Sequence, residues 1–446
     1  MSTSQLEALS ASQAARAIRD GEISSEDLAQ ACLARIRATE PQVQAWQVLD
    51  EQHVLTQARA RDQDRREGLQ CGPLHGVPVG IKDIIDTADM PTEDGTVLHA
   101  GRNPDGDATV VASLRAAGAV IMGKTVTTEL ATYTPGKTRN PHNFEHTPGG
   151  SSSGSAAAVA AGMVPFAIGT QTNGSVIRPA AFCGVYGFKP THGLIPRHGI
   201  LKLSRTLDTV GVFARSLEDI ALVTQELVGY DERDPDSRPR AKMPLVATLA
   251  QDPPLTPSLA LVRTPLWDRT SPDMREAFAE LAELLGADCV EYPLPDSLGQ
   301  AWDWMRTIQE AEMAFHLDVE WERGRDRLSE SLRSQLARGR EISALDHQKA
   351  LARTAQIIDG FDELFARHDA ILTPSAPGTA PKADTTGDPS FCSLWSLCGM
   401  PACNLPLMAG ADGLPLGLQL VGRRGADAKL LRTARWLVGR VESANV

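Results

Sequence analysis

Features that mark several classes of protein are missing from this sequence of 446 residues. It has no run of about 18 apolar residues, and the N-terminal segment MSTSQLEALS has no basic stretch followed by an apolar one. We therefore expect no membrane contact and a cytoplasmic location. The seven cysteines form no C-x-x-C pair, and their odd number and scatter do not indicate a disulfide framework.

An excess of basic residues is also missing. The chain has 44 Lys and Arg residues against 56 Asp and Glu residues, which gives a formal net charge of −12. A nucleic-acid surface needs clustered Lys and Arg to neutralise phosphates. The charge balance therefore argues against a nucleic-acid partner. Because 42% of the residues are hydrophobic, we expect a folded globular protein with a small-molecule substrate.

Helical and strand patterns alternate over the first half of the chain. Two amphipathic helices are predicted at 10–20 and 25–39, the second beginning at a Ser24 cap and ending before Pro41. A charged helix is predicted at about 51–67. The segments that follow are predicted as strand and loop (76–86), helix (107–118), strand (119–123), helix (156–162) and strand (164–169). This alternation predicts an α/β core.

The second half is expected to be mostly helical before strand patterns return. A stretch rich in Pro, Asp and Arg at 231–257 predicts an exposed connection. Helices are expected from a cap at Ser271 and Pro272 to about residue 367. Strand and loop character returns at 371–381, and the last helix is expected near 426–440. The residues expected to pack this helical stretch are Trp302, Trp304, Phe315 and Trp321.

Three short patterns match known sites but lack the context that those sites need, and one cysteine lacks a catalytic partner. Residues 118–125 match a phosphate loop, yet 119–122 are themselves the predicted strand, so nucleotide binding is not expected. HNFEH at 142–146 matches a zinc motif that works only on a helix, and nearby prolines indicate a loop. Ser152 lies in a G-x-S-x-G pattern that no strand precedes. No His, Asp or Glu stands at a sequence spacing from Cys183 that would indicate a catalytic partner, so this cysteine is not expected to be a nucleophile.

One longer pattern, from 149 to 191, passes the same test. A Gly/Ser loop (GGSSSGS) leads into a helix of small residues, a buried strand and a second Gly/Ser turn (TNGSVIRPA). A flexible linker would not continue into a tightly packed helix of Ala and Val. The stretch resembles the signature of the amidase signature family, a GGSSGGS loop followed by GTDTGGSIR-x-PA. GVPVGIKDIIDT, GAVIMGKT, RNPHN, GMPACNLP and LPLGLQLVG resemble other segments of that family.

The resemblance covers about residues 70–215 and 370–440, and SVIRPA and PSAPGTAP look closest to the malonamidase-like branch. It implies a single amidase domain over 1–446. The implied α/β fold has a central mixed, mostly parallel twisted sheet flanked by helices. N-terminal helices would occupy 1–69, the core about 70–220 and 370–440, and a helical insertion about 271–367.

The resemblance also implies three catalytic residues. Ser175, in TNGS, would be the nucleophile, Ser151 the bridging serine and Lys82 the base. In the family the peptide bond that corresponds to Gly150–Ser151 is cis. A serine hydroxyl needs a neighbouring group to take its proton, and Ser-Lys pairs are one known solution. No metal and no organic cofactor is implied.

Lys82 can act as a base only if it is neutral. It follows the apolar run 77–81, so burial is expected, and burial lowers the pKa of a lysine because the charged form loses its hydration. The alternative is that the adjacent Asp83 or Asp86 keeps it charged in a structural ion pair.

The turn before the nucleophile would stabilise the negative oxygen of the tetrahedral intermediate. Backbone N–H groups of Thr172, Asn173 and Gly174 are the expected donors of this oxyanion hole. Two residues depart from the family pattern. Gln171 replaces an Asp, which affects a structural hydrogen bond, and Asn173 replaces a Gly, which Asn can do because it tolerates a left-handed backbone.

Two further residues are candidates for substrate binding. Arg178 stands one place further from the nucleophile than the arginine of the usual SIR motif. It could clamp a substrate carboxylate by bidentate hydrogen bonds, or form a structural ion pair under the turn. The sequence leaves both open. Tyr133 is a candidate for the acyl pocket.

These residues favour an amidohydrolase that cleaves the C–N bond of a small amide through a Ser175 acyl-enzyme. Urethanes and ureas present the same carbonyl and are alternatives. A second hypothesis is the glutaminase subunit of a tRNA-dependent amidotransferase, which would need a stable heteromeric complex. A catalytically dead binding protein is a third. We expect a small amide or carbamate as the substrate, and a monomer or homodimer.

Overall fold

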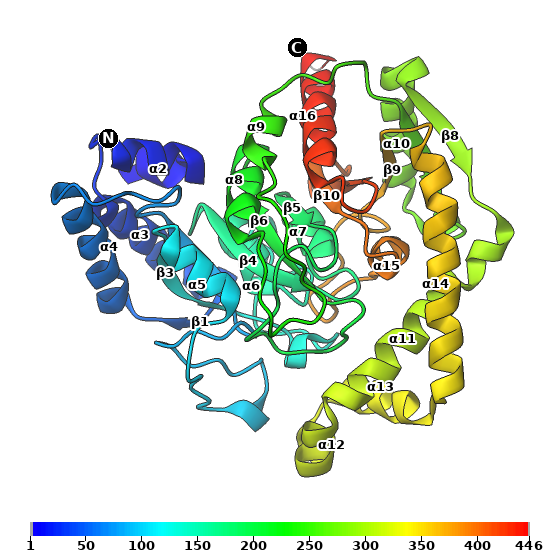
Figure 1. Ribbon diagram of the computed structural model, residues 1–446, viewed down its shortest axis with the longest axis horizontal. Helices are drawn as coiled ribbons and strands as arrows, with labels where there is room; N and C mark the ends of the chain where they lie inside the picture. Colours follow the sequence, from blue (N-terminus) through cyan, green and yellow to red (C-terminus); the bar gives the residue numbers. More distant parts are fainter. Residues whose placement is uncertain (1–2, 445–446) are drawn as a thin grey trace.

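A single sheet of eleven strands forms the centre of the computed structural model, which describes residues 3–444 (Figure 1). Its order is β1-β3-β2-β4-β6-β5-β10-β11-β9-β7-β8. The strands are β1 (Trp46–Leu49), β2 (Pro78–Lys82), β3 (Val120–Thr125), β4 (Phe166–Gln171), β5 (Tyr186–Lys189), β6 (Thr209–Ala214), β7 (Leu259–Arg263), β8 (Cys289–Pro293), β9 (Ala370–Pro374), β10 (Ala402–Ala409) and β11 (Pro415–Val421).

Helices cover both faces and both ends of this sheet (Figure 1). They are α1 (Thr3–Ala8), α2 (Ala11–Arg19), α3 (Ser25–Val43), α4 (Glu51–Arg66), α5 (Thr109–Ala116), α6 (Ser153–Ala160), α7 (Ile177–Phe182), α8 (Leu217–Leu227), α9 (Leu245–Leu249), α10 (Pro272–Leu285), α11 (Ala301–His316), α12 (Asp318–Gly324), α13 (Glu330–Glu341), α14 (Ala344–Phe365), α15 (Ser390–Leu397) and α16 (Asp427–Ala444). Within residues 3–444, no helix has the length and apolar character needed to cross a membrane.

The predicted single α/β domain with a mixed sheet is confirmed, but the prediction that the sheet is mostly parallel is wrong. Over residues 3–444, parallel pairing joins β2 to β3 and β4, and β7 to β8 and β9, whereas the other six strand pairs are antiparallel. The reason is visible between β10 and β11, because a connection of five residues is too short for the crossover that parallel strands require.

The predicted N-terminal helices are present, but strand β1 lies between two of them and one helix ends later than predicted. Ser24 caps α3, accepting a hydrogen bond from the Asp27 N–H, but the helix passes through Pro41 instead of ending before it. A proline removes only one hydrogen-bond donor, and the helix instead ends where Gln44 turns left-handed, with φ 53°, and donates its N–H to Glu40 O.

Three expectations for the second half need correction. The stretch expected to be helical contains β8, a mostly exposed edge strand whose five residues carry a weak strand pattern. Phe315 is 77% exposed and does not pack the core, because it lies on the outer side of α11. The exposed connection at 231–257 buries Asp234, which binds Arg197. Trp302, Trp304 and Trp321 are partly buried, as expected.

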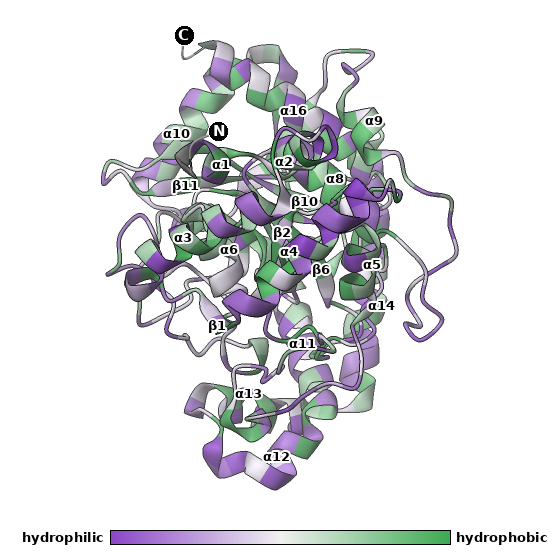
Figure 2. Cartoon of the chain, turned by 90° about the vertical axis from the view of Figure 1, so that its left-hand side faces the viewer, coloured by the Kyte–Doolittle hydropathy of each residue, from purple (hydrophilic) through white to green (hydrophobic). Residues whose placement is uncertain are grey.

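The hydrophobic core follows the sheet and places the signature segments together. Figure 2 shows hydrophobic residues through the middle of the molecule and hydrophilic ones on the outward sides of the helices. β2 and β4 are adjacent parallel strands, so their carboxyl ends meet at one edge. Lys82 ends β2 and Gln171 ends β4. The helical segment α11–α14 extends past this edge (Figure 1).

Candidate active site

Lys82 is brought to the signature loop by its strand. All five residues of β2 are buried, and Lys82 itself is 0% exposed. Its Nζ donates hydrogen bonds to Ser151 Oγ at 2.7 Å and to Thr170 Oγ1 at 2.9 Å. Both partners are neutral hydroxyl groups, so the nitrogen is held in place without a carboxylate.

The surroundings of Lys82 decide between a base and a structural ion pair. Asp83 lies 3.6 Å from Lys124 Nζ, and Asp86 binds Arg102 at 2.5 Å. Within residues 3–444 neither acid forms an ion pair with Lys82. Burial lowers the pKa of Lys82 to about 7, although the nearby negative charge of Asp208 works in the opposite direction. A substantial fraction of the amine is therefore neutral at neutral pH.

Ser151 lies in a loop that contacts helix α7 on one side and strand β4 on the other. The Gly150–Ser151 bond is cis, as the resemblance implies. Gly149 has φ +86°, and a Cβ there would lie 2.7 Å from Pro179 Cα, so only glycine fits. The next serine, Ser152, donates to Thr170 O at 3.1 Å and accepts from Thr170 N at 3.2 Å. These contacts lock Ser152 against β4.

The turn that follows β4 is held by the side chain of Gln171. Its Oε1 accepts hydrogen bonds from the N–H groups of Val176 at 2.8 Å and Ile177 at 3.0 Å, and its Nε2 donates to Ser396 Oγ at 2.9 Å. The departure at this position therefore does not remove the structural hydrogen bond. The amide supplies the oxygen acceptor that a carboxylate would supply.

The residues expected in the oxyanion hole are fixed through their other groups. The Thr172 hydroxyl donates to Asp208 Oδ1 at 2.6 Å, and Asn173 Oδ1 accepts from Ser393 Oγ at 2.7 Å. No hydrogen bond within residues 3–444 uses the backbone N–H of any residue from 172 to 175 as its donor. These N–H groups are left available to another acceptor.

Ser175 lies in the turn that Gln171 holds. It directly precedes Val176, the first N–H held by Gln171, and is 8% exposed. Across the described part of the chain, 3–444, its hydroxyl makes no hydrogen bond. The structure thus joins Lys82 and Ser151 directly, whereas Ser175 lies on the facing turn without a bond to either.

Arg178 ties the turn to the Ser151 loop. It is 1% exposed; its Nη2 donates to Gly150 O at 2.7 Å and its Nε donates to Thr386 O at 2.7 Å. Over the described range 3–444 the structural ion pair is not seen, because its partners are two carbonyl oxygens and the Thr386 hydroxyl and not a carboxylate, whereas the clamp on a substrate carboxylate stays a prediction. Its Nη1 is buried without a hydrogen-bond partner among residues 3–444.

Tyr133 faces the turn from the other side. Its hydroxyl accepts a hydrogen bond from Asn173 Nδ2 at 3.1 Å. Both residues line a cavity of about 520 Å³ that is bounded by α11, α13 and the start of α15. This cavity is the larger space next to the expected oxyanion hole.

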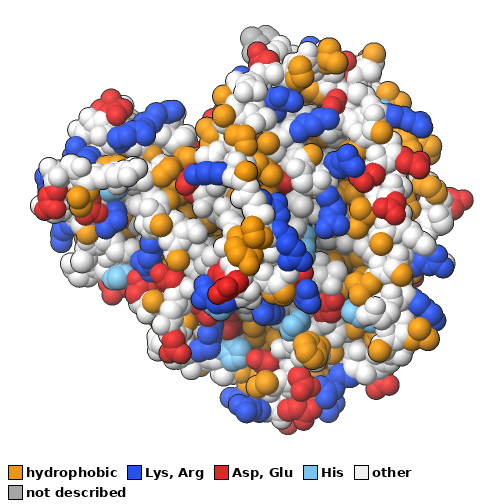
Figure 3. Space-filling model, viewed as in Figure 1, with side chains coloured by type: hydrophobic (Ala, Val, Ile, Leu, Met, Phe, Trp, Pro, Cys, Tyr) orange, Lys and Arg blue, Asp and Glu red, His pale blue; other side chains and the backbone are white. Residues whose placement is uncertain are grey.

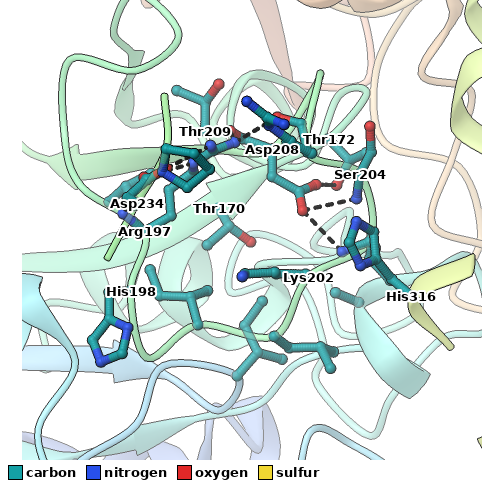
Figure 4. A pocket seen from close by; sticks show the side chains of 18 of the residues that line it. Thr170, Thr172, Arg197, His198, Lys202, Ser204, Asp208, Thr209, Asp234 and His316 are labelled. Carbon is teal, nitrogen blue, oxygen red and sulfur yellow. Dashed lines mark hydrogen bonds and ion pairs between the residues drawn. The ribbon is translucent and has the colours of Figure 1, made fainter. Parts of the chain in front are cut away.

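A second, smaller pocket of about 70 Å³ lies beside Thr170 and Thr172 (Figure 4). We call it the Lys202 pocket; apart from these two threonines and Ala131, its wall comes mainly from residues 197–210, with 233–235 and His316. Leu130 and Ala131, in the loop that reaches it, have φ 44° and 56°. Non-glycine residues adopt this left-handed backbone rarely, and such strain clusters at functional sites.

The short motifs rejected from the sequence lie in structural roles. Residues 120–125 form strand β3, as predicted. His142 Nε2 lies 3.0 Å from Cys183 O and His146 Nδ1 lies 2.6 Å from Ala380 O, in a segment that is not helical. Burial raises the pKa of the Cys183 thiol well above its usual range, which disfavours the reactive thiolate.

Sequence reasoning missed Thr170 and Asp208. A threonine at the end of an apolar strand is a weak signal, because strands contain many threonines. Asp208 carries no local signal at all. It is placed by tertiary structure, where it binds the Thr172 hydroxyl and the N–H groups of Leu203 and Ser204.

The architecture is that of an α/β protein with a buried lysine–serine contact, and comparisons with known proteins give its family. The family model "Amidase" matches residues 27–431. A glutamyl-tRNA(Gln) amidotransferase subunit from Chloroflexus aggregans is 36% identical over 469 residues, covering 96% of this chain and 95% of that protein.

Two solved structures extend the similarity. Peptide amidase from Stenotrophomonas maltophilia is 32% identical with a TM-score of 0.85, covering 98% of this chain and 97% of that chain. A 6-aminohexanoate cyclic dimer hydrolase is 26% identical with a TM-score of 0.87, and the coverage is the same. The chain belongs to the amidase family. It is an enzyme, an amidase-signature hydrolase of amide carbon–nitrogen bonds.

Proposed function

We propose that the chain hydrolyses small amides through an acyl-enzyme, with Ser175 as nucleophile, Ser151 as bridging serine and Lys82 as base. The observation that carries this proposal is the buried 2.7 Å hydrogen bond between Lys82 Nζ and Ser151 Oγ. A lysine whose pKa burial has lowered to about 7 can accept a proton at neutral pH.

The proton path follows from this contact. Neutral Lys82 takes the proton of Ser151, Ser151 takes the proton of Ser175, and the Ser175 oxygen attacks the amide carbonyl. The same path then returns a proton to the departing nitrogen, so that ammonia or an amine leaves. Water, activated by the same groups, attacks the acyl-enzyme and releases the carboxylate. Thr170 keeps the lysine nitrogen in place throughout.

The negative oxygen of the intermediate would be bound by the free backbone N–H groups of Thr172, Asn173 and Gly174. Preorganised donors of this kind contribute about 3–4 kcal/mol each to the transition state. These backbone donors must be held rigidly. The hydrogen bonds from Thr172 to Asp208 and from Ser393 to Asn173 support this rigidity.

Arg178 and Tyr133 keep lesser roles in this proposal. Arg178 positions Gly150, next to the bridging serine, while its unpartnered Nη1 leaves the predicted substrate clamp open to test. Tyr133 lines the 520 Å³ cavity, which has room for the acyl part of a substrate.

The test is amide hydrolysis by the purified full-length chain, measured as release of ammonia or amine from a panel of aliphatic amides, aryl amides, half-amides and urethanes. Ser175→Ala should lower turnover at least about 10³-fold on every substrate that responds. Ser297→Ala, at a serine far from the relay, is the matched control. Mass spectrometry should locate a fluorophosphonate adduct on Ser175. Labelling elsewhere, or full activity of Ser175→Ala, would refute the assignment.

A second candidate function is favoured by the comparisons. The 36% identity to an amidotransferase component, over nearly all of both chains, supports release of ammonia from glutamine for a partner protein. Turnover of small amides by the isolated chain, found as a monomer or homodimer by light scattering, favours the first function. Hydrolysis confined to glutamine and dependent on a co-purifying partner protein favours the second. The cytoplasmic location expected from the sequence is kept as part of both proposals.

A further inference from the structure

The Lys202 pocket lies one side chain away from the proposed base. Thr170, which accepts a hydrogen bond from Lys82 Nζ, forms part of its wall, and so does Thr172 of the expected oxyanion hole. Figure 4 shows Lys202, His198 and His316 around the same hollow. A substrate group in this pocket would therefore sit beside the reacting carbonyl.

Most charged groups around the pocket are already neutralised. Arg197 binds Asp234 at 2.9 Å and Asp236 at 2.6 Å, and Arg205 also binds Asp236, at 3.1 Å. Arg233, which also lines the pocket, binds Asp231 at 2.7 Å. Each arginine has a carboxylate within hydrogen-bond distance, so none brings an uncompensated positive charge.

Asp208 in the wall of the pocket and Glu312 behind it accept hydrogen bonds as well. Asp208 accepts hydrogen bonds from Thr172, Leu203 N and Ser204 N, at 2.6, 2.8 and 2.9 Å. Glu312, on α11, accepts from the hydroxyl groups of Ser204 and Thr206, from the Thr206 N–H and from His347 Nε2. These hydrogen bonds use their lone pairs, while the negative charge of Asp208 remains in the wall of the pocket.

Lys202, whose side chain is exposed, is the exception. Its ammonium forms no hydrogen bond and no ion pair within the part of the chain that the structure describes, 3–444, and neither do the rings of His198 and His316. Burial lowers the pKa of His316, so at neutral pH this ring offers an N–H and little charge. The pocket thus combines the unpaired ammonium of Lys202 with the neutral N–H donor of His316. Over the face in Figure 3, in contrast, basic and acidic side chains are interspersed.

We infer that the Lys202 pocket binds a carboxylate carried by the amide substrate, with Lys202 as the cation and His316 as a second donor. This specificity rests on the function proposed above. The size agrees with it, because a volume of about 70 Å³ gives room for a carboxylate.

Equilibrium binding to the full-length Ser175→Ala protein tests this without turnover. The ligands are succinamate and valeramide, which have the same length but differ in that an ethyl group replaces the carboxylate. By calorimetry, succinamate should bind about 10- to 100-fold more tightly, as charge-assisted hydrogen bonds allow. Adding Lys202→Met should reduce this preference to near one, and Lys202→Arg should keep most of it. Lys349→Met, at an exposed lysine on α14, is the matched control and should leave the preference unchanged.

Two outcomes overturn the inference. One is equal affinity for the two ligands, or no detectable binding of succinamate. The other is a preference that survives Lys202→Met. Failure of the proposed function looks different, because the Ser175→Ala protein would then release ammonia from these amides while the preference could still depend on Lys202.

Discussion

If neutral Lys82 is the base, the rate of hydrolysis must follow the titration of its ammonium group. Burial lowers the pKa of this group to about 7, far below the reference value of about 10.4 for an exposed lysine. The deprotonated amine is the active form, so kcat/KM should rise with pH and then level off. For a substrate that carries no charge, the pH at which kcat/KM rises gives the pKa of Lys82 in the free enzyme.

The size of the effect follows from the titration. With a pKa of about 7, about 9% of the amine is neutral at pH 6, about half at pH 7 and about 90% at pH 8. The rate constant should therefore increase about tenfold between pH 6 and pH 8. Ammonia is measured directly in stopped samples, because a coupling enzyme would add its own pH dependence.

Asp208 supplies a second perturbation of known sign. Its negative charge favours the ammonium form of Lys82, so Asp208→Asn should lower the pKa further and move the limb to lower pH. The quantity to compare is the pH at which kcat/KM rises. The rate itself is not a suitable measure, since loss of the hydrogen bond to Thr172 will also lower it. A flat profile between about pH 6 and 8, or a limb above about pH 9 in the wild-type protein, would refute the neutral-lysine mechanism.

Two predictions concern stability, each measured by urea unfolding. Gln171→Leu leaves the N–H groups of Val176 and Ile177 without their acceptor and should cost about 1–3 kcal/mol for each, whereas Gln171→Glu keeps the acceptor and should cost less. Asp234→Asn leaves the buried guanidinium of Arg197 partly uncompensated and should cost about 3 kcal/mol. An unchanged unfolding midpoint in either case would show that the side chain does not hold its loop.

Local pattern was sufficient where the chain itself carries the signal. The apolar run before Lys82 predicts a buried strand and a buried lysine, and β2 has both. The Gly/Ser loop and the small-residue helix predict α6 for a similar reason, since only small side chains fit where a Cβ at Gly154 would lie 2.3 Å from Ala45 O. Strand direction was not predictable in the same way. The antiparallel pairing of β4 with β6 joins residues about 45 positions apart, and no local pattern encodes it.

The same limit applies to the candidate site. The positions of Lys82, Ser151 and Ser175 follow from motifs, but their electrostatic surroundings do not. The adjacent Asp83 was a plausible partner for Lys82, yet alternation along the strand direction places it with Lys124, on the other side. Thr170, which replaces a carboxylate as the partner of Lys82, comes from a different strand.

Net charge illustrates how far composition can mislead about a single pocket. The chain as a whole carries −12, which suggests little affinity for anions. The segment 231–236, expected to be an exposed connection, instead folds back and supplies the carboxylates that neutralise Arg197, Arg205 and Arg233. Because these acids are consumed by the arginines, they are not available to Lys202. What governs recognition of a small ligand is this local pairing, since the exposed Lys202 has no carboxylate from residues 3–444 in contact with it, while surface charges farther away than a Debye length are screened.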